Sequence, residues 1–164
     1  MDYDPFATTF SSSRQNHPWP ELDAIIEDMQ KHDTKSVLDI GCGNGRFLES
    51  YELRAMHDTI HYLGIDSSVG MIEEARRLHP DHHFEVIDMG SISSYPFSIT
   101  PYDSILFLAS FHHLGTKEQR IKTLQDTKKL LSPHGRIYMT NWNLRDQERY
   151  DTSKTGDGEY QIKI

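Results

Sequence analysis

The chain has 164 residues, 36% of them hydrophobic and 26% charged, which suits one folded domain with a sizeable core and is too short for two ordinary domains. Its formal net charge of −8, from 25 acidic and 17 basic residues, excludes a uniformly basic surface for nucleic acid, so any RNA contact needs a local basic patch. The one cysteine, Cys42, excludes an internal disulfide and a cysteine-rich zinc site.

The N-terminal sequence MDYDPFATTF lacks the basic and apolar regions of a secretory leader. No apolar window approaches the roughly 20 residues that cross a bilayer. Together with the single cysteine, these features predict a cytoplasmic protein without membrane contact.

Helices and strands alternate along the chain. A helix is expected from Pro20, because Leu22, Ile25, Ile26 and Met29 follow helical spacing. Strands are expected over 35–40, 60–66, 82–88, 102–109 and 135–142, with helices over 45–55, after Ser67 or Ser68, and after Thr116. This order predicts a parallel sheet with helices on both faces and a ligand at the carboxyl ends of the strands.

Two of these helices carry more detailed expectations. The helix after Ser68 places Val69, Ile72 and Ala75 on one face. The next helix begins with a capping box of Thr116 and Gln119, and Ile121, Leu124 and Leu131 are expected to point inward. After Trp142 the chain is polar, and at most one short strand is expected near EYQIKI.

The stretch VLDIGCGNG runs from a strand into a helix, so its glycines permit a tight turn and close backbone approach to a ligand. A dinucleotide fingerprint needs G-x-G-x-x-G, whereas Arg46 stands where its last glycine would be. No Lys-Ser or Lys-Thr pair follows the loop, which disfavours a phosphate-binding P-loop.

Carboxylates end three successive strands: Asp39, Asp66 and Asp88. Their strands place all three at one edge of the sheet, where they suit a ligand with an ammonium group, a ribose diol and an exocyclic amine. Each aspartate alone is equally well explained as a turn or cap residue.

The segments VLDIGCGNG, GIDSS and VIDMGS resemble the three cofactor-binding motifs of class I S-adenosylmethionine-dependent methyltransferases. The resemblance implies a Rossmann-like, doubly wound, mostly parallel α/β sheet in three layers, here lacking the usual last two strands. It also implies S-adenosyl-L-methionine as cofactor, S-adenosyl-L-homocysteine as product and no metal. The methionine part would lie on Asp39 and the glycine loop, the ribose on Asp66, and the adenine on Asp88 and the backbone of Met89. The implied cofactor residues are Asp39, Gly41, Cys42, Gly43, Asn44, Gly45, Asp66, Ser67, Asp88 and Met89.

A narrower resemblance concerns the wobble-uridine tRNA methyltransferases that esterify a 5-carboxymethyl group. That family has a Phe-Ser-x-x-Arg run leading to Pro-Trp-Pro, a His-His after the fourth strand, and a Trp followed shortly by Gln after the fifth. The matching residues here are Phe10, Ser11, Arg14, Pro18, Trp19, Pro20, His112, His113, Trp142 and Gln147.

This narrower resemblance implies a catalytic site. A carboxylate substrate is ionised at neutral pH and needs no general base, but it needs a clamp, which Arg14 would supply. His112 would donate a hydrogen bond near the transferred methyl, and His113 is assigned to packing. The simpler interpretations are a surface arginine for Arg14 and a cap residue for His112.

Three functions stay open at this point. The first is methylation of a modified uridine in tRNA, with Arg14, Arg145, Arg149 and Lys154 as candidates for the basic patch. The second is small-molecule O- or N-methylation, and the third is a silent cofactor-binding interaction module. An exposed edge on the fifth strand invites a second copy of the chain, or a small activating subunit like the one that eukaryotic family members bind. We expect one domain over 1–164, comprising an N-terminal segment and helix (1–34), a cofactor-binding core (35–142) and a polar tail (143–164).

Overall fold

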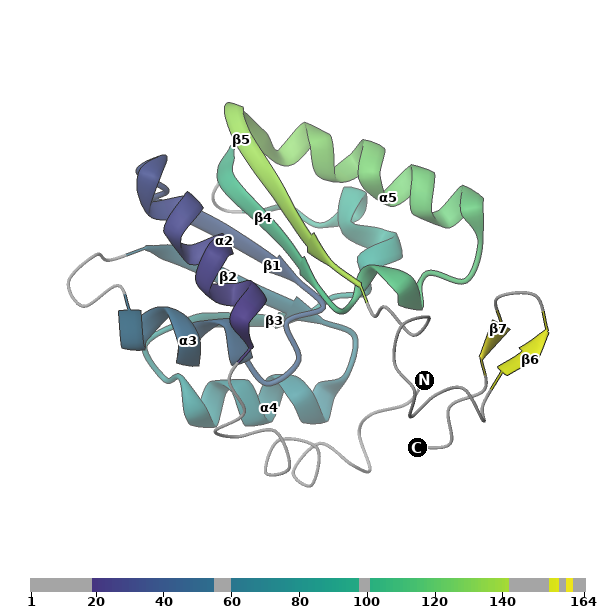
Figure 1. The fold of residues 1–164 in the computed structure, drawn as a ribbon, viewed down its shortest axis with the longest axis horizontal. Coiled ribbons are helices and arrows are strands. Elements are labelled where there is room, and N and C mark those ends of the chain that lie inside the picture. The colour runs from purple at the N-terminus through teal and green to yellow at the C-terminus, as the bar shows by residue number, and fades with distance from the viewer. Residues whose placement is uncertain (1–18, 55–59, 98–100, 142–153, 157–158, 161–164) are drawn as a thin grey trace.

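The computed structural model describes residues 19–54, 60–97, 101–141, 154–156 and 159–160 (Figure 1). Its α-helices are α2 (Pro20–Lys31), α3 (Arg46–Arg54), α4 (Val69–Leu78) and α5 (Lys117–Leu130). Its first five strands are β1 (Ser36–Ile40), β2 (His61–Asp66), β3 (His83–Val86), β4 (Tyr102–Leu108) and β5 (Leu131–Thr140). Two 3₁₀ helices, η2 (Met89–Ser94) and η3 (Phe111–His113), follow β3 and β4.

The five strands form one sheet in the order β3-β2-β1-β4-β5, and every pairing in it is parallel. The central strand β1 is buried along its whole length, as expected for a strand covered on both faces. From β1 the strands are added toward one edge of the sheet up to β3, and from β4 they are added toward the other edge. The crevice at such a switch point, here between β1 and β4, is where open α/β sheets bind ligands. The expected α/β fold is therefore confirmed.

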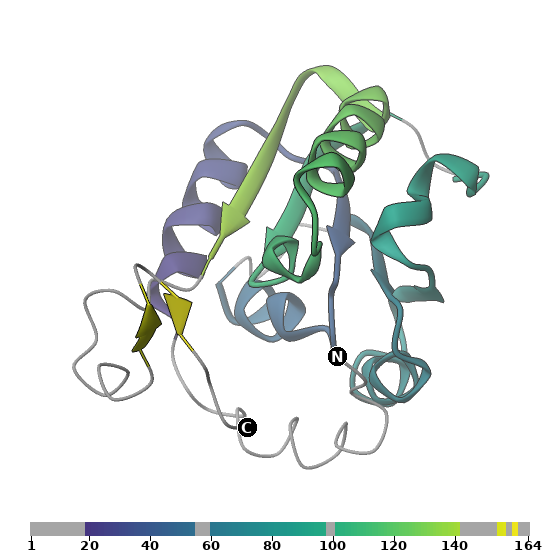
Figure 2. The same cartoon turned by 90° about the vertical axis from the view of Figure 1, so that its right-hand side faces the viewer.

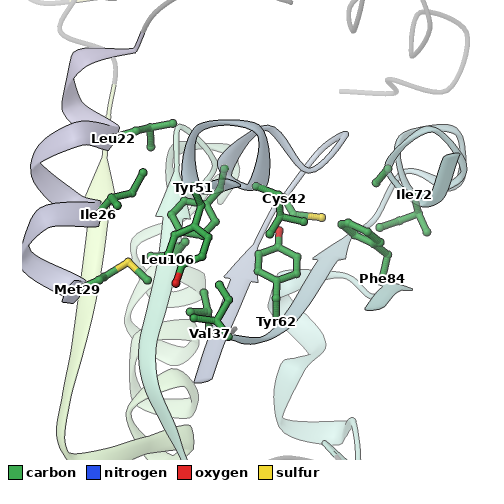
Figure 3. Close-up of a cluster of buried hydrophobic side chains, with 14 residues drawn as sticks. Leu22, Ile26, Met29, Val37, Cys42, Tyr51, Tyr62, Ile72, Phe84 and Leu106 are labelled. Atoms are coloured by element: carbon green, nitrogen blue, oxygen red, sulfur yellow. The ribbon is translucent and has the colours of Figure 1, made fainter. Parts of the chain in front are cut away.

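Helices cover both faces of the sheet, so the molecule has three layers (Figures 1 and 2). On one face α2, α3 and α4 pack around Val37 and Leu106, and Figure 3 shows part of this first core. The other face, built from Leu38, Ile105 and Phe107, packs against η2, η3 and the end of α5. Both cores end at the carboxyl edge of the sheet, where the glycine loop leaves β1.

Several expected elements are confirmed. In α2, Leu22, Ile26 and Met29 are fully buried and Ile25 packs against the same core. Ser68 caps α4, accepting a hydrogen bond from the Met71 amide at 3.1 Å. The capping box of α5 is present in both directions.

The inward face of α5 was predicted wrongly. Ile121 and Leu124 are 46% and 36% exposed, while the side chains turned inward are Thr123, Asp126 and Thr127. Asp126 is stabilised there by Lys122 at 2.7 Å and Lys129 at 2.6 Å. The helix packs on the polar segment η2, which explains why polar residues face inward.

Other boundaries also shift. Val69 is 48% exposed, and Met71 takes its place beside Ile72 and Ala75 in the core. Leu131 does not end a helix, because it already pairs with Tyr102 and so begins β5 four residues before the expected start. Strand β3 ends at Val86, so Asp88 lies just beyond it.

The polar tail contains two short strands, β6 (Lys154–Gly156) and β7 (Glu159–Tyr160), where at most one was expected. They pair with each other in an antiparallel sheet of their own. Among the described residues, β5 has a sheet neighbour on one side only. No helix in the described part of the chain is long and apolar enough to cross a membrane.

Candidate functional site

The glycine loop between β1 and α3 is fastened to the end of β2. The amides of Gly41 and Cys42 both donate to the Ile65 carbonyl, at 2.8 and 3.0 Å. Gly41 has φ +75° and Gly43 has φ +56°, a backbone region that other residues adopt only with strain. An added Cβ at Gly41 would overlap Ser110, whereas at Gly43 it would meet open space. The loop is thus held rigid at Gly41 and bare at Gly43.

Asp66 links this loop to the start of α4. One carboxylate oxygen accepts from the Gly43 amide at 3.0 Å, and the other accepts from the Ser68 amide at 2.9 Å. A carboxylate oxygen can accept more than one hydrogen bond, so both oxygens can also receive hydroxyl donors from a ligand. The residue is only partly buried and faces the crevice.

Asp39 is 1% exposed, yet it is a charged residue at the end of a central strand. Its Oδ2 accepts from the Tyr62 hydroxyl at 2.9 Å, while its Oδ1 has no hydrogen-bond partner. Burial raises the pKa of Asp39 to about 7; the Tyr62 hydrogen bond acts against this rise, and the Asp66 charge adds to it. An unpartnered buried carboxylate oxygen is costly, and a cationic ligand group would stabilise it.

Asp88 caps the 3₁₀ helix η2 and is exposed. Its Oδ1 accepts from the Gly90 amide at 2.8 Å, and the residue lines the crevice. Met89, the next residue, packs partly into the second core.

These residues surround one cavity of about 260 Å³ at the carboxyl edge of the sheet. All of the residues predicted to bind the cofactor line it, except Gly45. The other lining residues, which sequence reasoning did not assign to the cofactor, are Trp19, Arg46, Phe47, Met71, Ile87, Leu108, Ala109, Ser110, His113 and Leu114.

Gly45 serves the packing beneath the loop. It has φ +81°, and an added Cβ would lie 2.8 Å from His79 Cδ2 and 3.2 Å from the Phe84 ring. We therefore expect Gly45→Ala to lower the free energy of unfolding by about 2 kcal/mol or more, from overpacking and backbone strain together. Urea unfolding measures this loss. Gly43→Ala is the matched control, since its Cβ meets no neighbour, and an equal loss in both variants would contradict the packing role of Gly45.

The wall opposite the glycine loop comes from the end of β4. Ala109 has φ +51°, a strained value for a residue with a side chain, and its amide donates to Thr140 Oγ1 at 2.9 Å. The Ser110 hydroxyl donates to the Ile40 carbonyl at 2.5 Å. This wall could have been predicted from the order of strands and helices in the sequence. In such a fold β4 lies beside β1 at the switch point, so the carboxyl end of β4 borders the ligand.

The two adjacent histidines, His112 and His113, differ in whether they line the cavity. His113 lines the cavity, whereas His112 is not among its lining residues. Their rings are 4.3 Å apart, and burial lowers the pKa of both. Arg14 lies outside the described residues, as do Trp142 and Gln147.

Trp19 and Arg46 form one side of the cavity. The Arg46 guanidinium carbon lies 4.8 Å from the centroid of the Trp19 ring, within the range of a cation–π interaction. Trp19 immediately precedes α2, and Arg46 is the first residue of α3. The pair therefore joins the N-terminal helix to the glycine loop.

The described residues contain no group of three or more histidine, cysteine, aspartate or glutamate side chains arranged to hold a metal ion. The acidic cavity residues are spread over three strand ends and engage backbone amides or a hydroxyl.

A parallel α/β sheet with carboxylates at or just beyond the carboxyl ends of its first three strands, around a glycine loop, defines a nucleoside-binding domain of the Rossmann-like class. The chain belongs to the methyltransferase domain family, whose model matches residues 37–135, more than half of the sequence. The resemblance to methyltransferases is confirmed by this match.

Curated relatives narrow the comparison. The chain is 30% identical over 152 residues to the tRNA (carboxymethyluridine(34)-5-O)-methyltransferase alkbh8 of Xenopus tropicalis, covering 93% of this chain and 22% of that protein. It is 28% identical over 143 residues to the tRNA (carboxymethyluridine(34)-5-O)-methyltransferase of Saccharomyces cerevisiae, covering 87% of this chain and 47% of that one. The chain thus spans less than half the length of these relatives.

Solved structures agree on the fold. The plantazolicin methyltransferase BpumL, in complex with a pentazolic desmethylPZN analog and SAH, superposes with a TM-score of 0.67 at 26% identity, over 92% of this chain and 57% of that one. An S-adenosylmethionine-dependent methyltransferase from Clostridium acetobutylicum gives a TM-score of 0.69 at 18% identity, over 98% of this chain and 65% of that one.

Proposed function

We propose that this chain binds S-adenosyl-L-methionine in the cavity at the carboxyl edge of the sheet and transfers its methyl group to the 5-carboxymethyl group of a wobble uridine in tRNA. The observation that carries the cofactor assignment is the buried Oδ1 of Asp39, which has no hydrogen-bond partner and belongs to a residue that lines the cavity. The substrate assignment is supported by the names of the curated relatives.

The cavity residues fit the three polar parts of the cofactor. Asp39 would receive the ammonium group, since a buried carboxylate oxygen without a donor favours a cation. Asp66 would accept from the two ribose hydroxyls, and Asp88 from the adenine amino group. The bare backbone at Gly43 lets the ligand lie against the loop. Bound there, the cofactor would supply an activated methyl group on a sulfonium.

The chain's own contribution to methyl transfer is alignment and exclusion of water. Phe47, Leu108 and Leu114 give the cavity apolar walls between its acidic ends. A carboxylate acceptor is already ionised at neutral pH, so no side chain has to remove a proton from it. A cation must instead hold the acceptor near the three aspartates.

Two arginines suit that cationic role. Arg14 is proposed as the carboxylate clamp on the narrower resemblance. Arg46 is a described cation on the cavity wall, where it makes a cation–π contact with Trp19. For the donor near the methyl, His112 was the choice from sequence. The lining of the cavity favours its neighbour His113 for that role.

Several wider properties belong to the same proposal. We propose one cytoplasmic domain with the 1–34, 35–142 and 143–164 division given above. Its candidate protein partners are a small activating subunit or a second copy, docking on the edge of β5 that has no sheet neighbour among the described residues. The overall charge of −8 requires tRNA to bind through a local basic patch, so binding should weaken steeply with salt.

The test is transfer of radiolabelled methyl from S-adenosylmethionine to bulk tRNA, run with and without an extract fraction as a source of activating protein. We expect label in tRNA that mild alkali releases, because a methyl ester hydrolyses whereas a methylated base or ribose does not. Asp66→Ala is the negative control. Alkali-stable label would contradict the ester. Label only in a small-metabolite pool would favour a small-molecule methyltransferase, and no transfer despite tight cofactor binding would favour a silent module.

A further inference from the structure

Tyr62 and Asp39 meet across two adjacent strands on the same face of the sheet. In the β1–β2 register Val37 is opposite Tyr62 and Asp39 is opposite Gly64. Because side chains alternate along a strand, Tyr62 and Gly64 share the face that carries Asp39. Gly64 has no side chain, and Cys42 and the Phe84 ring pack over it, each within 3 Å of where its Cβ would be. This packing encloses the Tyr62 hydroxyl beside Asp39.

The Tyr62 ring is fixed by aromatic neighbours. It stacks on Phe47 at 6.1 Å with an interplanar angle of 7°, and meets the edges of Phe84 at 5.7 Å and His82 at 5.6 Å. The side chain is 4% exposed. In Figure 3 the ring stands on β2 with its hydroxyl directed toward Cys42 in the glycine loop. A hydroxyl held this firmly fixes the orientation of the group it donates to.

We propose that Tyr62 is a positioning residue: its hydroxyl holds Oδ2 of Asp39, leaves Oδ1 as the acceptor for a ligand in the cavity that Asp39 lines, and stabilises the charged carboxylate that receives a cationic ligand group. The proposal rests on the proposed binding of S-adenosylmethionine for the identity of that group. Its geometric basis is the 2.9 Å hydrogen bond on one oxygen and the absence of any partner on the other.

The surrounding charges are consistent with this role. Asp66 from the end of β2 raises the pKa of Asp39, and burial raises it most, to about 7; Tyr62 is the one group that lowers it. Burial raises the pKa of Tyr62 and of the Cys42 thiol well above their ordinary values, so both stay protonated near neutral pH. Behind Tyr62, His82 pairs with Glu52 of α3 at 3.4 Å.

The first test follows Asp39 itself and needs no cofactor. Carboxyl ¹³C NMR between pH 5 and 9 reports its ionisation in the wild type and in Tyr62→Phe, with the signal assigned by Asp39→Asn. We expect the midpoint to move upward by about one pH unit in Tyr62→Phe, since a hydrogen bond to a charged group has about that effect. Tyr51→Phe is the matched control, a buried tyrosine of the same core, and should leave the midpoint in place. An unchanged midpoint in folded Tyr62→Phe would overturn the proposal.

The second test measures cofactor affinity by calorimetry across the same pH range. Wild-type affinity should rise as pH increases from about 6 to about 8. Tyr62→Phe should bind about fivefold more weakly at pH 7, since a midpoint one unit higher lowers the ionised fraction of Asp39 from about one half to about one tenth, and its affinity should approach that of the wild type as pH rises further. Binding of 5′-methylthioadenosine, which lacks the ammonium group, should be equal in both proteins. Equal loss for both ligands would contradict a role through Asp39. If the ionisation midpoint of Asp39 shifts in Tyr62→Phe but neither protein binds the cofactor, the proposed function is contradicted and the effect of Tyr62 on Asp39 still holds.

Discussion

Asp66→Ala is expected to weaken S-adenosylmethionine binding at least about 100-fold, below detection in a calorimetric titration. The variant removes the acceptors proposed for the ribose, and it also removes the hydrogen bonds to the Gly43 and Ser68 amides that hold the loop. Hydrogen bonds to a charged group contribute about 1.5–3 kcal/mol each, so losing these contacts accounts for the size of the effect.

Asp103→Ala is the matched control for this result. Asp103 likewise accepts from two backbone amides, those of Lys35 and Ser36 at 3.0 Å, but at the opposite end of the sheet. Its removal should lower stability and leave cofactor affinity unchanged. Near-wild-type affinity in folded Asp66→Ala would show that the ribose does not lie on Asp66.

Asp39→Asn is expected to change stability and binding in opposite directions. The Asp39 pKa of about 7 lies above its ordinary value, so the folded wild type holds a proton that the unfolded chain has released between about pH 4 and 7. Wild-type stability therefore falls as pH rises through this window, and stays lower above it. Above pH 7 this raised pKa corresponds to about 4 kcal/mol of lost wild-type stability, which the neutral side chain of the variant avoids. The unpaired amide of the variant costs about 1–3 kcal/mol and offsets part of that gain.

We thus expect Asp39→Asn to unfold at higher urea concentration than the wild type at pH 8, by about 1–3 kcal/mol, and to bind S-adenosylmethionine at least about 100-fold more weakly. Near pH 4, where both side chains are neutral in the folded protein, only the cost of the unpaired amide should remain, so the variant should be no more stable than the wild type. Urea titrations at pH 4 and 8 measure the first effect and calorimetry the second. A variant that is less stable at pH 8 and binds normally would contradict the buried, charged state assigned to Asp39.

Much of the fold followed from local sequence signals. Buried runs such as VLDI predict a covered parallel strand, and Ser68 and Thr116 cap their helices as their side-chain chemistry requires. The prediction of the α5 face was wrong because helical periodicity assumes an apolar neighbour, whereas η2 presents polar atoms to Thr123 and Lys122. Lys122 in turn pairs with Asp126.

The part of the candidate site that could be predicted from sequence is its set of aspartates near strand ends. Asp39, Asp66 and Asp88 line the cavity because parallel strands bring their carboxyl ends to one edge. Gly45 was predicted to bind the ligand, whereas it packs beneath the loop against His79 and Phe84. These contacts join distant segments of the chain, so the sequence pattern does not indicate them. The choice between His112 and His113 depends on the turn of η3, which periodicity does not specify.

Two further residues could not be assigned from sequence for the same reason. Arg46 lies on the cavity wall in contact with Trp19, which comes from a distant segment. Tyr62 looked like any apolar strand residue, and its contact with Asp39 depends on the β1–β2 register and on the missing side chain at Gly64.

The most direct test of the central claim is a calorimetric titration of the wild-type chain with S-adenosyl-L-methionine at pH 8, where Asp39 is ionised, with NAD and ATP titrated in parallel. The account predicts saturable binding of one equivalent of S-adenosylmethionine and none of the two phosphate-bearing nucleotides, which the three aspartates repel. Tight binding of NAD or ATP, or no heat with S-adenosylmethionine, would contradict the assignment of this cavity.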